Sequence, residues 1–417
     1  MRDGSWTYVA MAIPVFFGLI TVELLAAWWM GRRVYRTPAA VADMGCGVLQ
    51  QVVATFARVA LFAGYLGVYG HFRLFELSSG SLAVWVFGFL GVDCAYYWFH
   101  RTSHHVGVMW AAHVVHHQSE DYNFAVALRQ GAFQPFFSWI FYIPLALVGL
   151  PPLVMATCSS LNTLYQFWVH TQLVPRLGPF EWVFNTPSHH RVHHGRNPQY
   201  IDKNHAGTLI VWDRLFGTFE PEDDAVVYGI TEPVETFDPV QAHLHPWRQL
   251  WDRSRRTRGL WDKVRVWVMP PGWCPSDLRA EPSRPLDAPL HDASSTSGIQ
   301  TYVLAQFGLL VPLTMSMLYF RKTVEVGPRA AVALWMGVTL VSLASLLERR
   351  RSRLEWFRLA TVPAVAAFAW YAVDLSVLHG AALGSVWTAA SAVVLARARR
   401  QVERADELGL DRSGAAT

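Results

Sequence analysis

Long apolar runs separated by short polar segments dominate the chain. A helix needs about 20 predominantly apolar residues to cross a bilayer. The clear runs lie near 8–30, 48–70, 82–99, 302–320, 330–347, 359–378 and 382–396. A further apolar region, 136–173, is interrupted by Pro144, Pro151 and Pro152, which predicts a helical hairpin with a Gly-Leu-Pro-Pro turn. The pattern therefore predicts an all-α, polytopic membrane protein.

Composition supports this interpretation and excludes some partners. The chain is 52% hydrophobic and only 16% charged, whereas a soluble domain carries about 25% charged residues. The formal net charge of +4 does not indicate a nucleic-acid partner. The four cysteines are widely spaced, which fits neither a disulfide framework nor a zinc ribbon.

The order of apolar and polar segments predicts five parts. We expect N-terminal membrane helices in 1–80 and a histidine-rich helical domain in 81–275. A linker rich in Pro, Ser and Asp follows at 276–298. C-terminal membrane helices occupy 299–400, and 401–417 forms a polar tail.

Basic residues predict which side of the membrane each loop faces. Three strong clusters lie at 32–36, 348–353 and 397–404. With the end of the first helix in the cytoplasm, the predicted crossings put all three clusters on the cytoplasmic side, as the positive-inside rule requires. The same topology places the histidine-rich segments at the cytoplasmic face.

Ten of the 17 histidines fall into three clusters. Within the clusters, histidines recur at i, i+3 and i+4, and a helix brings residues at these spacings onto one face. Burying so many imidazoles without partners would cost a few kcal/mol each, whereas metal ions would satisfy them. The eight predicted ligands in the clusters are His100, His104, His113, His116, His117, His190, His193 and His194.

One more ligand is predicted outside the clusters. Asn162, Gln166 and His170 recur every four residues in an apolar helix, so they must face something polar, and we expect His170 to bind metal. Nine imidazoles are too many for hydrolytic zinc, which uses about three protein ligands. They suit two non-haem iron ions.

Metal-bound histidines usually donate their second ring N–H to a carboxylate or a carbonyl. The sequence offers several candidates for this supporting role, or for an additional place in the metal shell. They are Asp93, His105, Glu120, Asp121, His189, Asp202 and His205.

On these residues the sequence resembles the fatty acid hydroxylase/sterol desaturase superfamily, whose HxxxH, HxxHH and HxxHH boxes match the three clusters. The segments "MWAAHVVHHQSEDYNFAVALRQ" and "NTPSHHRVHHGRNPQYIDKNHAG" narrow the resemblance to its alkylglycerol monooxygenase family. Two positions depart from that pattern. His105 stands where an acidic residue is expected, and His205 stands where an aromatic one is expected.

The resemblance implies a diiron, O2-dependent monooxygenase. It would hydroxylate the ether-bearing carbon of an alkylglycerol from the bilayer and release a fatty aldehyde, with tetrahydrobiopterin as reductant. The chain has no G-x-G-x-x-G fingerprint, so its electrons must come from an external donor, a pterin or a redox protein. Two alternatives are a sterol or fatty-acyl hydroxylase or desaturase and, from another class, a membrane metal transporter or sensor.

Overall fold

The computed structural model describes residues 4–280, 282–292, 295–319, 324–350, 353–371 and 376–407. Helices joined by loops make up these segments, and their β pairing is confined to two isolated bridges, Phe184–Leu209 and Gly195–Tyr228. The predicted all-α fold class is confirmed. Of the predicted polar tail 401–417, residues 408–417 lie outside the described segments.

The chain divides into two compact units. The first unit comprises Met1–Arg36, Val53–Val234 and Ala242–Leu290. The second unit comprises Thr37–Val52, Glu235–Gln241 and His291–Thr417. The domain boundaries proposed from the sequence, at 80, 275, 298 and 400, stay predictions.

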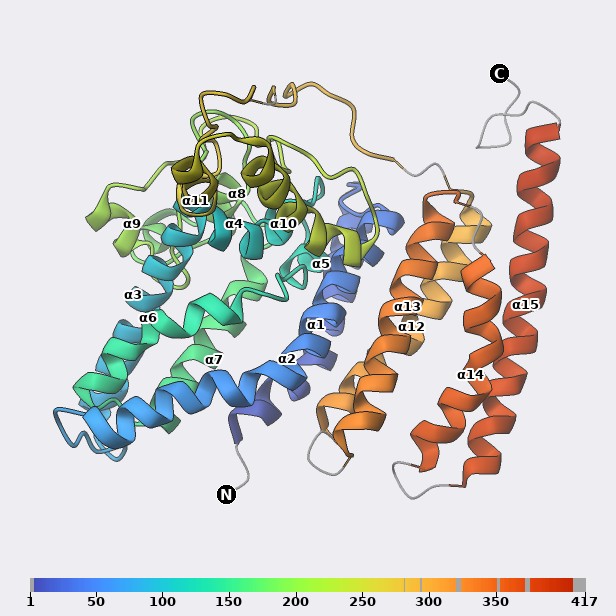
Figure 1. Cartoon of the computed structure of the whole chain (residues 1–417), viewed down its shortest axis with the longest axis horizontal. Helices are drawn as coiled ribbons and strands as arrows, with labels where there is room; N and C mark the ends of the chain where they lie inside the picture. Colours follow the sequence, from blue (N-terminus) through green and yellow to red (C-terminus); the bar gives the residue numbers. More distant parts are fainter. Residues whose placement is uncertain are drawn as a thin grey trace. The chain divides into compact units, whose positions relative to one another are not determined.

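Short helices and loops alternate with longer helices along the first part of the chain (Figure 1). The longer helices are α1 (Gly4–Trp29), α2 (Thr37–Phe72), α3 (Leu82–His105), α6 (Pro135–Val148), α7 (Pro152–Trp168) and α10 (Pro239–Arg256). The shorter ones are α4 (Gly107–His113), η1 (Val114–His117), α5 (Phe124–Ala127), η2 (Gly178–Trp182), α8 (Pro187–His193), α9 (Val211–Phe216) and α11 (Leu260–Val268). The C-terminal helices are α12 (Ser297–Tyr319), α13 (Val326–Leu347), α14 (Arg353–Tyr371) and α15 (Val377–Glu407).

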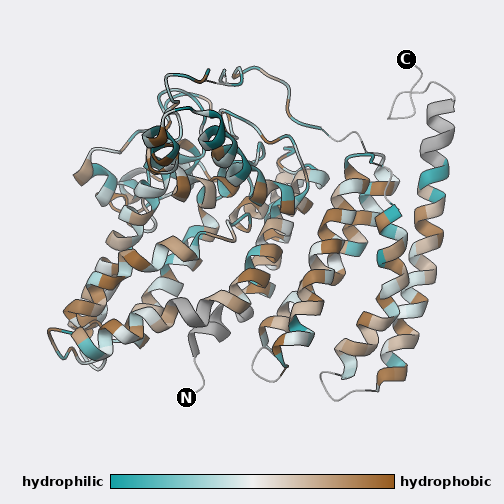
Figure 2. Cartoon of the chain, in the orientation of Figure 1, coloured by the Kyte–Doolittle hydropathy of each residue, from teal (hydrophilic) through white to brown (hydrophobic). Residues whose placement is uncertain are grey.

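Among the described residues, six helices are long and apolar enough to cross a membrane, and brown apolar residues dominate them in Figure 2. The segments are Ala12–Trp29, Thr37–Ala57, Leu82–His105, Ser297–Tyr319, Val326–Leu347 and Val377–Arg400. The span predicted at 48–70 is found at Thr37–Ala57, so it begins earlier in the chain and ends before Arg58. The run predicted at 359–378 is not among the six, and its residues 372–375 lie outside the described segments. The described helix there, α14, starts earlier and carries Glu355 and Arg358.

Close packing in the first unit holds α3 against the α6–α7 hairpin. A Cβ added at Gly88 would lie 2.8 Å from Val154 Cγ1, so only glycine permits this approach. The hairpin turns where the sequence predicted it, between Val148 and Pro152. At the turn, Gly149 has φ = +101°, a conformation that glycine adopts at little cost. This packing brings together the C-terminal half of α3, which carries His100 and His104, and the C-terminal half of α7, which leads to His170.

A buried polar cluster joins the helices of the second unit. Glu355 and Arg358 are both almost completely buried and form an ion pair at 2.6 Å. Arg358 also donates to Gln306 Oε1 at 2.7 Å, and Ser342 donates to Glu355 Oε2 at 2.8 Å. The pair thus ties α12, α13 and α14 together inside an apolar bundle.

We predict that Arg358→Met destabilises the protein by about 3–5 kcal/mol, because it leaves the Glu355 carboxylate buried without its counter-ion. The double variant Glu355→Gln/Arg358→Met should lose less, since it removes both charges. Thermal unfolding in detergent measures both effects. A double variant that is less stable than Arg358→Met would contradict this account.

Candidate metal centre

Four short stretches of helix position the predicted ligands. α3 presents His100 and His104 one turn apart, and α7 is followed two residues later by His170. The α4–η1 segment carries His113, His116 and His117, and α8 with its C-terminal cap carries His190, His193 and His194. All nine side chains are at most 5% exposed. Arg191 fixes α8 through a two-pronged pair with the Glu222 carboxylate, with both contacts at 2.6 Å.

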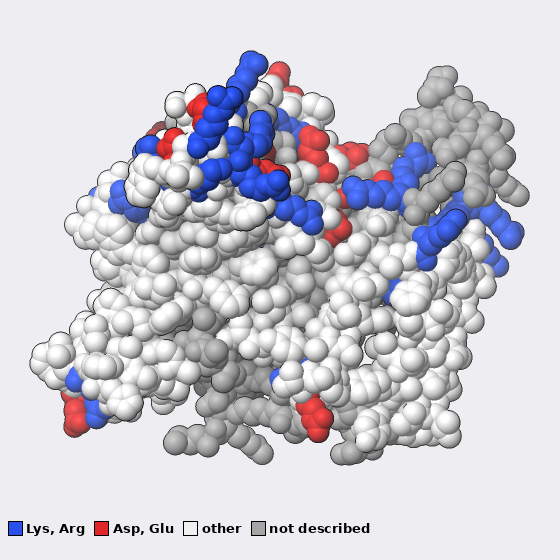
Figure 3. All heavy atoms as spheres, viewed as in Figure 1, with Lys and Arg blue, Asp and Glu red and all other residues white. Residues whose placement is uncertain are grey.

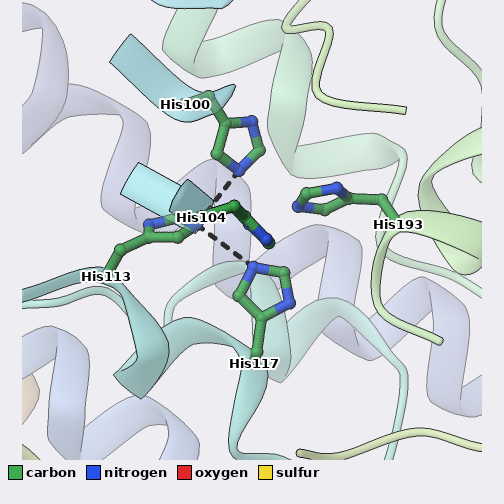
Figure 4. A group of neighbouring side chains, drawn as sticks. All are labelled: His100, His104, His113, His117 and His193. Atoms are coloured by element: carbon green, nitrogen blue, oxygen red, sulfur yellow. Dashed lines mark hydrogen bonds between the residues drawn. The ribbon is translucent and has the colours of Figure 1, made fainter. Parts of the chain in front are cut away.

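The structure brings the nine predicted histidines together in two groups. The five-histidine group contains His100, His104, His113, His117 and His193. The four-histidine group contains His116, His170, His190 and His194. Within each group the candidate ligand atoms all lie within 4.8 Å of one another. Figure 4 shows the five rings directed toward a common centre.

The outward-facing ring nitrogens bond to oxygen atoms that can only accept. Nδ1 of His100 lies 2.7 Å from the His205 carbonyl, and Nδ1 of His116 lies 2.8 Å from the Arg129 carbonyl. The same arrangement holds for His170 with the Gln166 carbonyl at 2.7 Å. It also holds for His193 with the Lys203 carbonyl at 2.8 Å. Each of these rings, when neutral, must carry its proton on Nδ1, so Nε2 presents a bare lone pair.

These lone pairs point at one another. Nε2 of His170 lies 3.2 Å from Nε2 of His116, and neither atom has a proton to share in this tautomer. In the five-histidine group, Nε2 of His113 lies 3.0 Å from Nε2 of His100 and 3.1 Å from Nε2 of His117. Nε2 of both His104 and His193 is buried with no hydrogen-bond partner. Converging lone pairs are the arrangement that a bound cation would stabilise.

The spacing fits a transition-metal ion. Imidazole nitrogens lie about 2.1 Å from such an ion, so two of them at right angles are about 3.0 Å apart. The Nε2–Nε2 distances of 3.0–3.2 Å in both groups match this value. The residues present therefore suit one metal ion in each group.

Burial keeps the rings neutral and ready to bind metal. Desolvation lowers the pKa of His113 to about 3, helped by the neighbouring His104. Desolvation likewise lowers the pKa of His170 to about 4. The pKa values of His116, His190 and His194 also fall well below 6.5, because each ring is desolvated and close to other histidines.

Asp202 contacts one of the predicted ligands, and its supporting role stays a prediction. Its carboxylate lies 3.2 Å from Nδ1 of His104. His205 orients His100 through its backbone carbonyl, which accepts a hydrogen bond from Nδ1 of His100. His105 is half-buried, with its ring 6.3 Å from that of His205. His189 packs its ring against Phe219 at 5.3 Å and lies outside both histidine groups.

The three other acidic candidates have other partners, and their supporting role stays a prediction. Asp93 is fully buried, but its carboxylate accepts N–H groups from Asn162, Thr208, Leu209 and Trp212 rather than from a histidine. Glu120 pairs with Arg284, and Asp121 pairs with Arg36 at 2.8 Å.

Sequence reasoning missed most of the groups that orient the rings. Gln134 Oε1 lies 2.9 Å from Nδ1 of His113, and the remaining acceptors are mostly backbone carbonyls. A glutamine at the start of an apolar helix was the only visible signal. Backbone carbonyls carry no sequence signature at all.

Several apolar helices and two groups of converging, buried imidazoles place this chain in the class of histidine-box membrane proteins. A family model described as fatty acid hydroxylase matches residues 85–218, the part of the chain that holds all nine histidines.

Comparison with curated proteins narrows this class. Alkylglycerol monooxygenase from Homo sapiens is 41% identical over 355 residues, which cover 82% of this chain and 78% of the relative. The Danio rerio protein of the same name is 40% identical over 84% of this chain and 79% of its own length. Ornithine lipid hydroxylase from Rhizobium tropici is 30% identical over 33% of this chain and 38% of its own length. The chain belongs to the alkylglycerol monooxygenase family. No solved structure matches it.

We predict that His194→Ala removes metal from the four-histidine group and abolishes turnover, because three imidazoles would remain there. His113→Ala should do the same for the five-histidine group. Metal content per chain and product formation are the measurements. The controls are His243→Ala, a buried histidine outside both groups, and His379→Ala, an exposed one. Full metal content in either ligand variant would contradict the assignment.

We also predict a pH effect on the metal-free protein. The pKa values of His113, His170 and their neighbours are lowered in the folded state, whereas unfolded histidine titrates near about 6.5. Below that pH the unfolded state binds more protons, so stability must fall as the pH drops from about 6.5 toward 4. Thermal unfolding of metal-free protein between pH 8 and 4.5 tests this. An unchanged Tm over that range would contradict it.

Proposed function

We propose that this protein is an iron-dependent membrane monooxygenase that uses O2 to hydroxylate the ether-bearing carbon of alkylglycerols. The single observation that carries this proposal is the pair of buried imidazole groups in a chain of the alkylglycerol monooxygenase family. The hydroxylated ether carbon is a hemiacetal, which collapses to a fatty aldehyde and a glycerol derivative.

The proposed cofactor is a pair of iron ions, one in each histidine group. Imidazole ligands suit iron, and two such ions would supply the reduction of O2 and the oxidation of the alkyl C–H bond. Two groups of four and five imidazoles are more than hydrolytic zinc chemistry uses, since zinc takes about three protein ligands and a water. The ligand roles of the nine histidines are part of this proposal.

The protein's own contribution is orientation and exclusion of water. The carbonyls that accept from Nδ1 of His100, His116, His170 and His193 fix these four rings and hold their protons on the outer nitrogen. All nine rings are closed off from solvent. Trp110 lies against the five-histidine group, with its ring 4.9 Å from His104. This indole forms part of the apolar wall beside the reaction site.

The distribution of charge suits a lipid substrate that enters from the bilayer. Lys and Arg gather at the end of the first unit that carries α10 and α11, where Arg255, Arg256 and Arg258 are exposed (Figure 3). Basic residues favour the cytoplasmic side, so we propose that the histidine groups lie at the cytoplasmic face. An alkyl chain could then stay in the membrane while its glycerol head group remains at the interface.

The reductant is proposed to be a cytoplasmic tetrahydropterin, tetrahydrobiopterin in the first instance. A separate redox protein is the alternative electron donor. A sterol or fatty-acyl hydroxylase or desaturase would use the same two histidine groups, so the product decides between these substrates. A metal transporter or sensor would bind metal but consume no O2.

The experiment for the substrate is a product analysis. Purified, iron-loaded protein is incubated with O2, tetrahydrobiopterin and a panel of alkylglycerols, fatty acids and sterols. We predict fatty aldehyde from the alkylglycerols alone, detected by mass spectrometry, and none from the His194→Ala variant. Hydroxylated or desaturated fatty acid or sterol without aldehyde would replace the ether-lipid proposal with the alternative.

The membrane orientation has its own test. In a background without the native cysteines, Ser283→Cys places one thiol in the 276–298 linker. We predict that a membrane-impermeant maleimide labels it only after the cytoplasmic face is opened. Labelling of this thiol in intact cells would overturn the cytoplasmic assignment.

A further inference from the structure

His205 is a buried imidazole that neither histidine group uses. Its side chain is completely buried, and both of its ring nitrogens lack a hydrogen-bond partner. An unpaired polar group in such a place carries an unfavourable desolvation free energy. It lies beside the five-histidine group, with its ring centroid 5.0 Å from that of His104, yet outside that group's cluster of ligand atoms.

The backbone fixes this ring in place. The His205 N–H donates to Asp213 Oδ1 at 2.7 Å, and its carbonyl receives Nδ1 of His100 at 2.7 Å. The preceding residues Asp202 and Asn204 both have positive φ, 58° and 54°, a conformation that is unusual for residues other than glycine. These contacts fix the backbone of His205, and its ring lies in a place where neither nitrogen has a hydrogen-bond partner.

A carboxylate completes the surroundings. Candidate ligand atoms of His104, Asp202 and His205 lie within 4.8 Å of one another. Asp202 lies 3.2 Å from Nδ1 of His104, and its side chain is 38% exposed. Asp202 thus connects the buried His205 with solvent, whereas the nine histidines of the two groups are closed off.

We propose that Asp202 and His205 form an outer metal site that binds a third divalent transition-metal ion. Nδ1 of His205 lies 3.8 Å from Asp213 Oδ1. A proton on this nitrogen would face a carboxylate, which leaves Nε2 as the ligand atom. The 3.8 Å separation is longer than a hydrogen bond, so the Asp213 carboxylate acts on this ring through its charge and not as a hydrogen-bond acceptor. His104 keeps Nε2 for the five-histidine group and orients the Asp202 carboxylate through Nδ1.

The donor set defines the kind of ion. An imidazole with one carboxylate and water suits Zn²⁺, Co²⁺ or Fe²⁺, whereas Mg²⁺ and Ca²⁺ prefer oxygen ligands. Two protein ligands and solvent access make the outer site weaker than either buried group. The inference goes beyond the proposed function, because it assigns a binding site that the oxidation of a lipid does not require.

Titration of the metal-free, full-length protein with Co²⁺ in detergent tests the outer site. Equilibrium dialysis gives the number of ions bound, and visible absorption follows each site as it fills. We expect wild type to bind one more Co²⁺ than His205→Phe, while Asp202→Asn weakens that additional ion at least tenfold. Matched controls are His189→Phe, a buried histidine outside the groups, and Asp223→Asn, an exposed acid. Both should bind as wild type does.

The comparison depends on a difference of one ion, so it holds whether or not the buried groups take two iron ions. Equal numbers in wild type and His205→Phe would overturn the proposal. Loss of a tightly bound Co²⁺ in a folded His205→Phe protein, with the weakly bound ion retained, would also overturn it, because His205 would then belong to the five-histidine group. His205→Asn, which is smaller and polar, gives the same comparison if the phenylalanine variant aggregates.

Discussion

The hydrogen bonds from Nδ1 to fixed oxygen acceptors are the interaction on which the site depends. Each such bond sets the tautomer of a ring, and the tautomer leaves an Nε2 lone pair directed inward. Nine histidines on four stretches of helix gather around two centres. A backbone carbonyl at Nδ1 directs the Nε2 lone pair of four of them inward: His100, His116, His170 and His193. Without cations these lone pairs would repel one another at 3.0–3.2 Å. A cation bound in each group would therefore also stabilise the folded region.

The rest of the first unit serves to hold these acceptors still. The fully buried Asp93 accepts from Asn162 on α7 and from the Thr208 and Leu209 amides, so it links α3, α7 and the loop after α8. Asp213 accepts the His205 and Ala206 amides at 2.7 and 2.8 Å and fixes the same loop. The carbonyl of His205, which orients His100, belongs to that loop. Asp93 and Asp213 therefore fix the backbone of this loop, and they act on His100 only through that backbone.

The sequence was most informative where chemistry and helical periodicity coincide. Spacings of i, i+3 and i+4 identified eight histidines, and a polar stripe on an apolar helix identified His170. The partners of Asp93 were not predictable, because they lie about 70 and 115 residues further along the chain and only the folded structure reveals them. Gln134 and the carbonyl acceptors were missed, since backbone groups are the same at every position. The ion pair between Glu355 and Arg358 explains how α14 can carry two charges inside an apolar bundle.

The most direct test of the two-group account is to locate the metal ions. Iron-loaded crystals, or X-ray absorption on iron-loaded protein, would report the positions and ligands of the bound ions. The account predicts two iron ions per chain, one bonded to Nε2 atoms of the five-histidine group and the other to Nε2 atoms of the four-histidine group. A single ion, or ions bonded mainly to oxygen ligands, would contradict it.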